Sequence, residues 1–200
     1  MQLTTMTKSL ALLLTSTIVT GSVLPRGAAT FDGYEVVPAS FSGTYNGHEY
    51  TLSGDIQGVS AQLEATYGPS TADGNVARSD TVLSRDADSK DGVHCIPIGG
   101  QNWQYANSAA IAQSVKDLQS RGGSIHVNGH SCARLSCLTS SAIFLCNDNN
   151  DGIAPQLNYI ASYASDIINR CGVSPFTPAL AAGQEFDTDH YNVIVREDSC

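Results

Sequence analysis

The sequence has little charge, and most of that charge is negative. Charged residues are 14% of the 200 residues, and 10 Lys and Arg stand against 19 Asp and Glu, which gives a formal net charge of −9. No two basic residues are adjacent. An acidic surface repels nucleic-acid phosphates and anionic lipid headgroups. The composition therefore argues against binding to nucleic acid and against docking on an anionic membrane.

Long apolar runs are also missing, except at the N-terminus. Lys8 precedes the apolar run 10–19 (LALLLTSTIV), and small residues follow at 20–22. This pattern is typical of a cleavable secretory signal peptide, and the run is too short to span a bilayer. We expect residues 1–22 to be a signal peptide and the protein to be secreted and extracellular, with no stable insertion into a membrane.

Cysteine is absent from the first 94 residues and then occurs six times. An even number of cysteines behind a signal peptide predicts disulfides rather than free thiols. Six cysteines allow fifteen pairings, and the sequence alone does not choose among them. The expected disulfide cysteines are Cys95, Cys132, Cys137, Cys146, Cys171 and Cys200.

The cysteine-free part of the chain divides into two segments. Residues 48–52 (HEYTL) predict a strand, and apolar residues at helical spacing predict a helix that ends at Gly68. We expect residues 23–68 to be an N-terminal strand–helix segment, either a pro-region or an accessory unit. Residues 69–92 are rich in Asp, Ser, Thr, Ala and Gly, which predicts a flexible linker.

Residues 93–200 predict a disulfide-stabilised α+β domain. The patterns indicate strands at 93–98, 124–128, 141–147 and 190–195, helices at 108–121 and 155–170, and a cysteine-bearing loop before residue 141. The order β-α-β-β-α-β is the split β-α-β arrangement, a small antiparallel four-stranded sheet with two helices on one face.

This predicted topology divides the cysteines between the two ends of the sheet. Three would lie toward each end, so they could not pair fully within the ends. Either one bridge crosses or one strand assignment is wrong. The predicted groups are Cys95, Cys146 and Cys200 at one end and Cys132, Cys137 and Cys171 at the other.

One segment partly matches a serine-hydrolase motif. Gly129 to Ala133 (GHSCA) has the first half of G-x-S-x-G, with Ser131 as the nucleophile, and His190 with Asp187 or Asp189 could complete a triad. The last glycine of the motif is missing. We therefore expect a structured loop here and no catalytic residues.

A histidine-containing segment has the spacing of metal ligands. His126, His130 and Cys132 could bind zinc, with His94 elsewhere in the chain. Cys132 is, however, expected in a disulfide because the protein is secreted. We therefore expect no zinc site.

The run 147–152 (NDNNDG) resembles the start of an EF-hand loop. Asn147 stands where Asp is usual, and Asn158 stands where the bidentate Glu is required, although Asn149, Asp151 and Gly152 fit. A tight turn explains the same residues. We expect no metal and no cofactor.

Carbohydrate chemistry has candidate residues but no recognisable pattern. Glycoside hydrolysis needs two carboxylates that face each other across a cleft, and aromatic residues at core-like spacing are weak evidence for sugar binding. The acidic candidates are Asp117, Asp148, Asp166 and Glu185, and the aromatic candidates are Trp103, Tyr105, Tyr159 and Tyr163.

The C-terminal half resembles a known group of proteins. The run C-x-R-x-S-C at 132–137, followed by S-A-I-x-x-C-N-D-N at 141–149, resembles small secreted cysteine-rich proteins of filamentous fungi, many of them candidate effectors. The resemblance covers residues 93–172, and residues 49–68 are more weakly similar to upstream segments of such proteins. The predicted architecture is also similar to that of virally encoded fungal killer toxins, which implies a disulfide-bonded α/β sandwich.

The resemblance implies a function without catalysis. We expect a secreted fungal effector, of the virulence type, that binds a host protein or a cell-wall component in the host apoplast or after uptake, and that is a monomer. The alternatives are a killer-toxin-like antimicrobial protein and a small secreted hydrolase. The negative charge is unlike the basic surface of many channel-blocking toxins.

Overall fold

The computed structural model describes residues 30–31, 33–71, 89–173 and 179–200. The predicted signal peptide, residues 1–22, lies outside the described residues, and so does most of the predicted linker 69–92. The fold is α+β, with a large mixed sheet, a small three-stranded sheet and, in the described residues, three helices.

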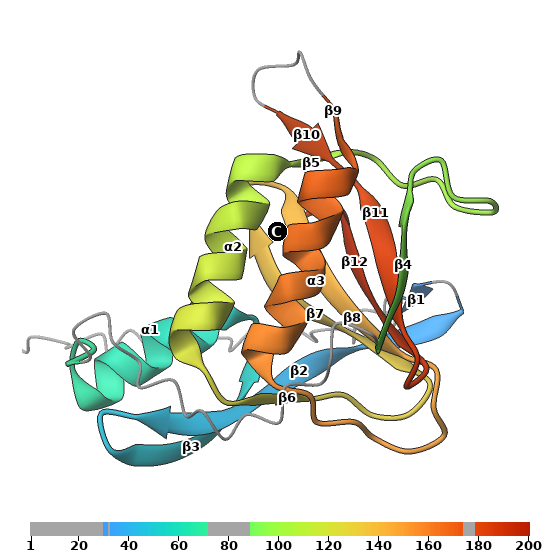
Figure 1. The fold of residues 1–200 in the computed structure, drawn as a ribbon. Coiled ribbons are helices and arrows are strands. Elements are labelled where there is room, and N and C mark those ends of the chain that lie inside the picture. The colour runs from blue at the N-terminus through green and yellow to red at the C-terminus, as the bar shows by residue number, and fades with distance from the viewer. Residues whose placement is uncertain (1–29, 32, 72–88, 174–178) are drawn as a thin grey trace, which may run out of the picture.

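The large sheet has strands from both halves of the chain (Figure 1). Its main path is β1 (Thr30–Phe31), β2 (Tyr34–Tyr45), β7 (Ser131–Leu138), β8 (Ser141–Asn147), β12 (Tyr191–Glu197), β11 (Gly183–Asp187) and β4 (Lys90–Cys95). Two more strands, β3 (His48–Gly54) and β6 (Ser124–His126), pair with the second half of β2. Strands β2 and β7 are parallel, whereas the other pairs are antiparallel. The small sheet has the order β5 (Ala106–Asn107), β10 (Leu180–Ala181) and β9 (Gly172–Val173).

Helices α1 (Ile56–Tyr67), α2 (Ser108–Arg121) and α3 (Leu157–Arg170) lie where the sequence predicts helices. The Asp55 side chain caps α1 by accepting a hydrogen bond from the backbone N–H of Gly58 at 2.9 Å. The Asn107 side chain caps α2 in the same way, through the N–H groups of Ala109 and Ala110. Helices α2 and α3 lie side by side over one face of the sheet (Figure 1).

The predicted α+β class and the two helices on one face of the sheet are confirmed, whereas the predicted four-stranded antiparallel sheet is wrong in extent and in topology. The predicted loop before residue 141 is instead strand β7, which lies between β2 and β8. The sequence pattern also missed β2 and β11. As a result, the first part of the chain belongs to the same sheet, and its parallel pairing with β7 makes that sheet mixed.

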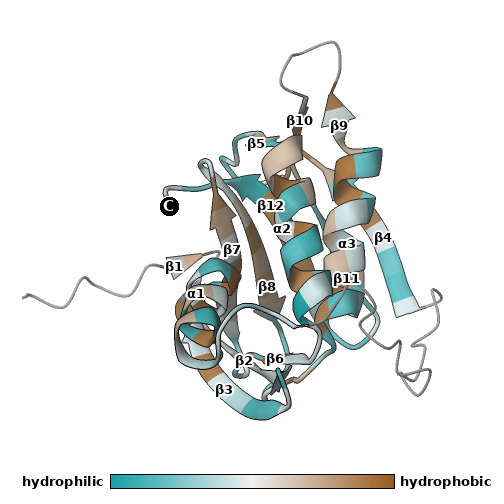
Figure 2. Cartoon of the chain, turned by 90° about the vertical axis from the view of Figure 1, so that its left-hand side faces the viewer, coloured by the Kyte–Doolittle hydropathy of each residue, from teal (hydrophilic) through white to brown (hydrophobic). Residues whose placement is uncertain are grey.

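The segment before residue 69 shares its hydrophobic core with the rest of the chain. Phe41 on β2 and Ile56 and Leu63 on α1 are buried in one cluster with Leu145 on β8 and Ile160 on α3. A second, smaller cluster covers the opposite face of the sheet around Phe31 and Phe144. Trp103, one of the aromatic residues considered for sugar binding, stacks on Phe31 there at 5.6 Å between ring centroids. Strands β7 and β8 are therefore covered on both faces, and they are largely brown in Figure 2.

All six cysteines form disulfides, as predicted. The pairs are Cys95–Cys171, Cys132–Cys146 and Cys137–Cys200. Each bridge joins one cysteine from each predicted group, so the predicted division between two ends of the sheet is wrong. The reason is strand β7, whose register with β8 sets Cys132 directly opposite Cys146.

Candidate binding groove

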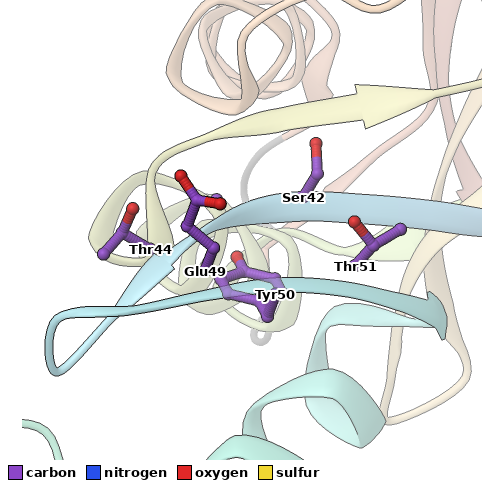
Figure 3. Close-up of a pocket in the computed structure, with 6 residues that line it drawn as sticks. Ser42, Thr44, Glu49, Tyr50 and Thr51 are labelled. Atoms are coloured by element: carbon purple, nitrogen blue, oxygen red, sulfur yellow. The ribbon is translucent and has the colours of Figure 1, made fainter.

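A shallow polar groove lies on the hairpin formed by β2 and β3 (Figure 3). Its volume is about 400 Å³. The residues that line it are Ser42, Gly43, Thr44, Glu49, Tyr50 and Thr51. Sequence reasoning found the β3 strand but assigned no function to these residues. The sequence feature that could have indicated these residues is the alternation of Ser and Thr with Gly and Tyr on both sides of Asn46-Gly47.

A two-residue turn sets the register of this hairpin. Asn46 and Gly47 both have positive φ, +48° and +82°, and they place Tyr45 opposite His48. This is the backbone that Asn-Gly favours in tight hairpins. The Asn46 side chain also donates hydrogen bonds to the carbonyl oxygens of Tyr67 and Pro69, so the turn is fixed to the end of α1.

The register gathers four polar side chains on one face. Ser42 lies opposite Thr51, and Thr44 lies opposite Glu49. Because side chains alternate along a strand, these two cross-strand pairs share a face. Figure 3 shows the side chains on the same side of the hairpin. Thr44, Glu49 and Thr51 are exposed, so hydroxyl groups and one carboxylate are available to a ligand.

Tyr50 and Gly43 face each other on the opposite side of the hairpin. A Cβ at Gly43 would lie 3.3 Å from the Tyr50 ring and from its hydroxyl oxygen, so the absent side chain leaves room for the ring. Tyr50 is 8% exposed, and its hydroxyl oxygen has no hydrogen-bond partner in the described residues. Burial raises the pKa of Tyr50, and the nearby Arg121 cation partly opposes that rise.

Replacing Tyr50 with Phe is expected to leave stability unchanged or to raise it by up to about 1 kcal/mol, because the change removes a buried, unpaired hydroxyl and keeps the ring over Gly43. The matched control is Tyr163→Phe, since the Tyr163 hydroxyl donates to Asp187 and its loss should destabilise the protein. Urea unfolding of both variants measures the two effects. A loss for Tyr50→Phe as large as that for Tyr163→Phe would contradict this reading of Tyr50.

A second group of ionisable residues lies between α3 and the sheet, with Glu185 buried and Asp166 partly exposed. Lys90 on β4 lies 2.6 Å from the Asp166 carboxylate on α3 and 4.0 Å from the Glu185 carboxylate on β11. Glu185 is 2% exposed, and its Oε2 atom accepts no hydrogen bond in the described residues. Burial raises the pKa of Glu185 to about 7, while Lys90 acts in the opposite direction.

The neighbouring carboxylate, Asp187, serves as an acceptor inside the fold. It accepts hydrogen bonds from the hydroxyls of Tyr159, at 3.0 Å, and Tyr163, and from the backbone N–H of Asp189 at 2.7 Å. Asp187 is 4% exposed and Tyr163 is fully buried. These acids and tyrosines therefore hold α3 on the sheet and do not line the groove. Four of them, Asp166, Glu185, Tyr159 and Tyr163, are residues considered for carbohydrate chemistry.

The residues considered for a serine hydrolase do not come together. The Ser131 hydroxyl donates to the carbonyl oxygen of Asn128 at 2.9 Å, and Ser131 is 4% exposed. Ser131 and Tyr191, the residue after His190, pair with opposite sides of Asn147 on β8. A whole strand therefore separates the serine from His190.

The residues with zinc-like spacing also have other partners. Cys132 is in a disulfide, and the His130 ring nitrogen Nε2 lies 2.8 Å from the Asn150 side-chain oxygen. His94 lies edge-on to Phe186, on the strand pair β4–β11. The described residues contain no group of three or more His, Cys, Asp or Glu that could hold a metal ion.

The EF-hand-like run forms a turn around one buried asparagine. The Asn147 side-chain nitrogen donates to the carbonyl oxygens of Asp151, at 2.8 Å, and Asn128, at 3.0 Å. Its side-chain oxygen accepts from the backbone N–H of Asn149 at 3.1 Å. Asn147 therefore uses its amide to hold the turn together, which agrees with the alternative reading of this run as a tight turn.

The other residues considered for carbohydrate chemistry are scattered. Asp117 accepts a hydrogen bond from Gln113 on the exposed side of α2. Asp148 follows β8, and Tyr105 precedes β5 with 38% of its surface exposed. None of these residues lines the groove.

Comparisons of the chain with protein-family models, curated proteins and solved structures found no match. Among the described residues, no helix is long and apolar enough to cross a membrane. The three disulfides are consistent with an extracellular protein.

Proposed function

We propose that this protein is a secreted fungal effector that acts by binding a host target, a protein or a cell-wall component, and not by catalysis. The observation that supports the proposal is the groove on β2 and β3, where the hairpin presents exposed hydroxyls and a carboxylate on one face. Disulfides suit such a protein because they stabilise a small domain in an oxidising, protease-rich environment. The resemblance of residues 93–172 to secreted fungal proteins supplies the biological setting.

The first test is colonisation of the producer's host by a strain that lacks the gene, together with growth of that strain in culture. The proposal expects reduced colonisation with normal growth, and restoration by the wild-type gene. Unchanged colonisation together with inhibition of competing microbes by the purified protein would replace the proposal with the killer-toxin-like alternative.

A separate prediction distinguishes the hydrolase alternative. Ser131→Ala is expected to leave colonisation and any measured binding unchanged, because the hydroxyl only donates to the Asn128 carbonyl. The stability loss should be about 1 kcal/mol, the usual value of one hydrogen bond. Colonisation assays with the complemented deletion strain and urea unfolding measure both quantities. Loss of function in a fully folded Ser131→Ala protein would favour a hydrolase.

A further inference from the structure

We propose that the outer edge of β3 binds an extended, basic segment of a partner protein as an additional strand of the sheet. This inference rests on the proposed function, because it names the kind of target that the groove recognises. In this binding mode, main-chain hydrogen bonds supply affinity, and the side chains beside the new strand supply selectivity.

The register of the hairpin determines which backbone groups of β3 point outward. In a hairpin with a two-residue turn, the closing pair, Tyr45 and His48, exchanges hydrogen bonds, and bonded and non-bonded pairs then alternate. Thr44–Glu49 and Ser42–Thr51 are therefore non-bonded pairs. Their N–H and C=O groups point away from the hairpin.

On the other side of the hairpin, strand β2 already uses its outward backbone groups to pair with another strand. The outward groups of β2 at Ser40 and Ser42 face β6, which pairs with β2 through His126 and Ser124. The equivalent groups on β3 belong to Glu49, Thr51 and Ser53. In the part of the chain that the structure describes, β3 pairs with β2 alone, and no strand lies along its outer edge. This edge can therefore accept a strand without displacing a described one.

The residues at this edge are accessible. Glu49, Thr51 and Ser53 are all exposed. Their side chains lie on the groove face of the hairpin, since they alternate with the buried Tyr50. One set of residues therefore offers both the free backbone groups and the polar side chains that an added strand would meet. Figure 3 shows Glu49 and Thr51 on neighbouring positions of this face.

Charge favours a basic partner. Glu49 is the charged residue of the groove, and the whole chain carries a formal charge of −9. A Lys or Arg side chain of the added strand, placed beside Glu49, would form a cross-strand ion pair, and the net charge would steer a basic segment toward the protein. The neighbouring position, beside Thr51, suits a small polar side chain. A second copy of this acidic chain is a poorer occupant because it carries the same charge.

The test measures binding of an alternating Lys-Thr octapeptide, with an alternating Glu-Thr octapeptide as the charge control, by fluorescence polarisation at low ionic strength. The Lys-Thr peptide is expected to bind at least about tenfold more tightly. In ¹⁵N spectra of the full protein, the largest shifts should fall on the amides of Glu49, Thr51 and Ser53. Equal affinity for the two peptides, or shifts elsewhere on the surface, would overturn the proposal.

Two variants at one position separate backbone pairing from side-chain contact. Thr51→Pro removes the outward N–H, and proline is tolerated on an edge strand when its nitrogen faces solvent. It should weaken Lys-Thr binding by about tenfold or more, whereas Thr51→Ala, which keeps the N–H, should change it by less than about threefold. Near-UV circular dichroism checks that both variants fold. If Thr51→Pro does not fold, the amide shifts of the wild-type protein decide the question.

Charge reversal provides an independent test. Glu49→Lys should abolish the preference for the Lys-Thr peptide, and Glu197→Lys, at an exposed position on β12, is the matched control that alters net charge equally. Equal effects of the two variants would overturn the proposed site. Binding to a cell-wall polysaccharide in place of peptides, or dimerisation that Thr51→Pro abolishes, would also overturn it.

The Thr51→Pro variant also distinguishes a failure of the β3-edge proposal from a failure of the effector proposal. A deletion strain that regains full colonisation with folded Thr51→Pro protein would leave the effector proposal standing and exclude the β3 edge as its binding site. A deletion strain without a colonisation defect would contradict the effector proposal, whatever the peptide results.

Discussion

Removing the Cys95–Cys171 bridge with the double substitution Cys95→Ala and Cys171→Ala is expected to lower the free energy of unfolding by about 4 to 5 kcal/mol. The two cysteines are 76 residues apart, and in the chain-entropy model a bridge that closes a longer loop restricts the unfolded chain more. The bridge also joins β4, at the edge of the sheet, to the residue that follows α3. Because a domain of this size has a free energy of unfolding of about 5–15 kcal/mol, the variant should be close to unfolding.

The Cys132–Cys146 bridge provides the matched comparison. Its cysteines are 14 residues apart and lie opposite each other on two strands that already pair. The same model gives a loss of about 3 kcal/mol for Cys132→Ala with Cys146→Ala. Urea unfolding of both double variants, with their m-values compared, measures the difference. An equal or larger loss for the shorter loop would show that native packing around the sulfurs outweighs the restriction of the unfolded chain.

The helices could be predicted because their signals are local. Asp55 and Asn107 stand at the N-caps, Gly68 and Gly122 follow the last turns, and the buried residues recur every three or four positions. Each of these features lies within one helix and its flanking residues. Sequence reasoning therefore located all three helices of the described chain to within about two residues.

Strand β7 was missed because it is buried on both faces, and because one of its two partners, β2, is distant in the sequence. It is covered on both faces, so the alternation of polar and apolar residues that marks a half-buried strand is absent. Two of its buried residues are polar. Ser131 bonds to Asn128, whereas Ser136 donates to Ser114 on α2 and accepts from Gln57 on α1. The long-range contacts of Ser136 make a serine acceptable in the core, and a local sequence pattern does not reveal them.

Strand β7 also explains why the cysteines pair differently from the predicted grouping. The assumption of a loop before residue 141 separated Cys132 from Cys146, although their register on β7 and β8 makes them direct neighbours. The sequence left two alternatives open, a bridge that crosses the sheet or a wrong strand assignment, and the missing strand β7 corresponds to the second. Strand β11 was missed for another reason, since its sequence, GQEFD, is poor in residues that favour strands.

Buried Glu185 on β11 should make the protein less stable as the pH rises from about 5 to 8. Folding raises the pKa of this carboxyl from 4.5 to about 7, so between these values the folded protein holds a proton that the unfolded chain has released. Stability falls with pH wherever the folded state binds more protons. This contribution is complete below about pH 4.5 and is lost as the pH rises through about 7, with a total of at most about 3 kcal/mol.

Glu185→Gln tests this prediction because an amide has a similar shape and does not ionise. The difference in unfolding free energy between the variant and the wild type should change by about 2 to 3 kcal/mol between pH 5 and pH 8, in favour of the variant at pH 8. Because the two proteins share all their other ionisable groups, the difference between their unfolding free energies removes the contribution of those groups. Glu197→Gln, at an exposed site, should leave the pH dependence unchanged. A wild-type protein whose pH dependence matches that of Glu185→Gln would mean that Lys90, 4.0 Å away, compensates fully for the burial of the carboxylate.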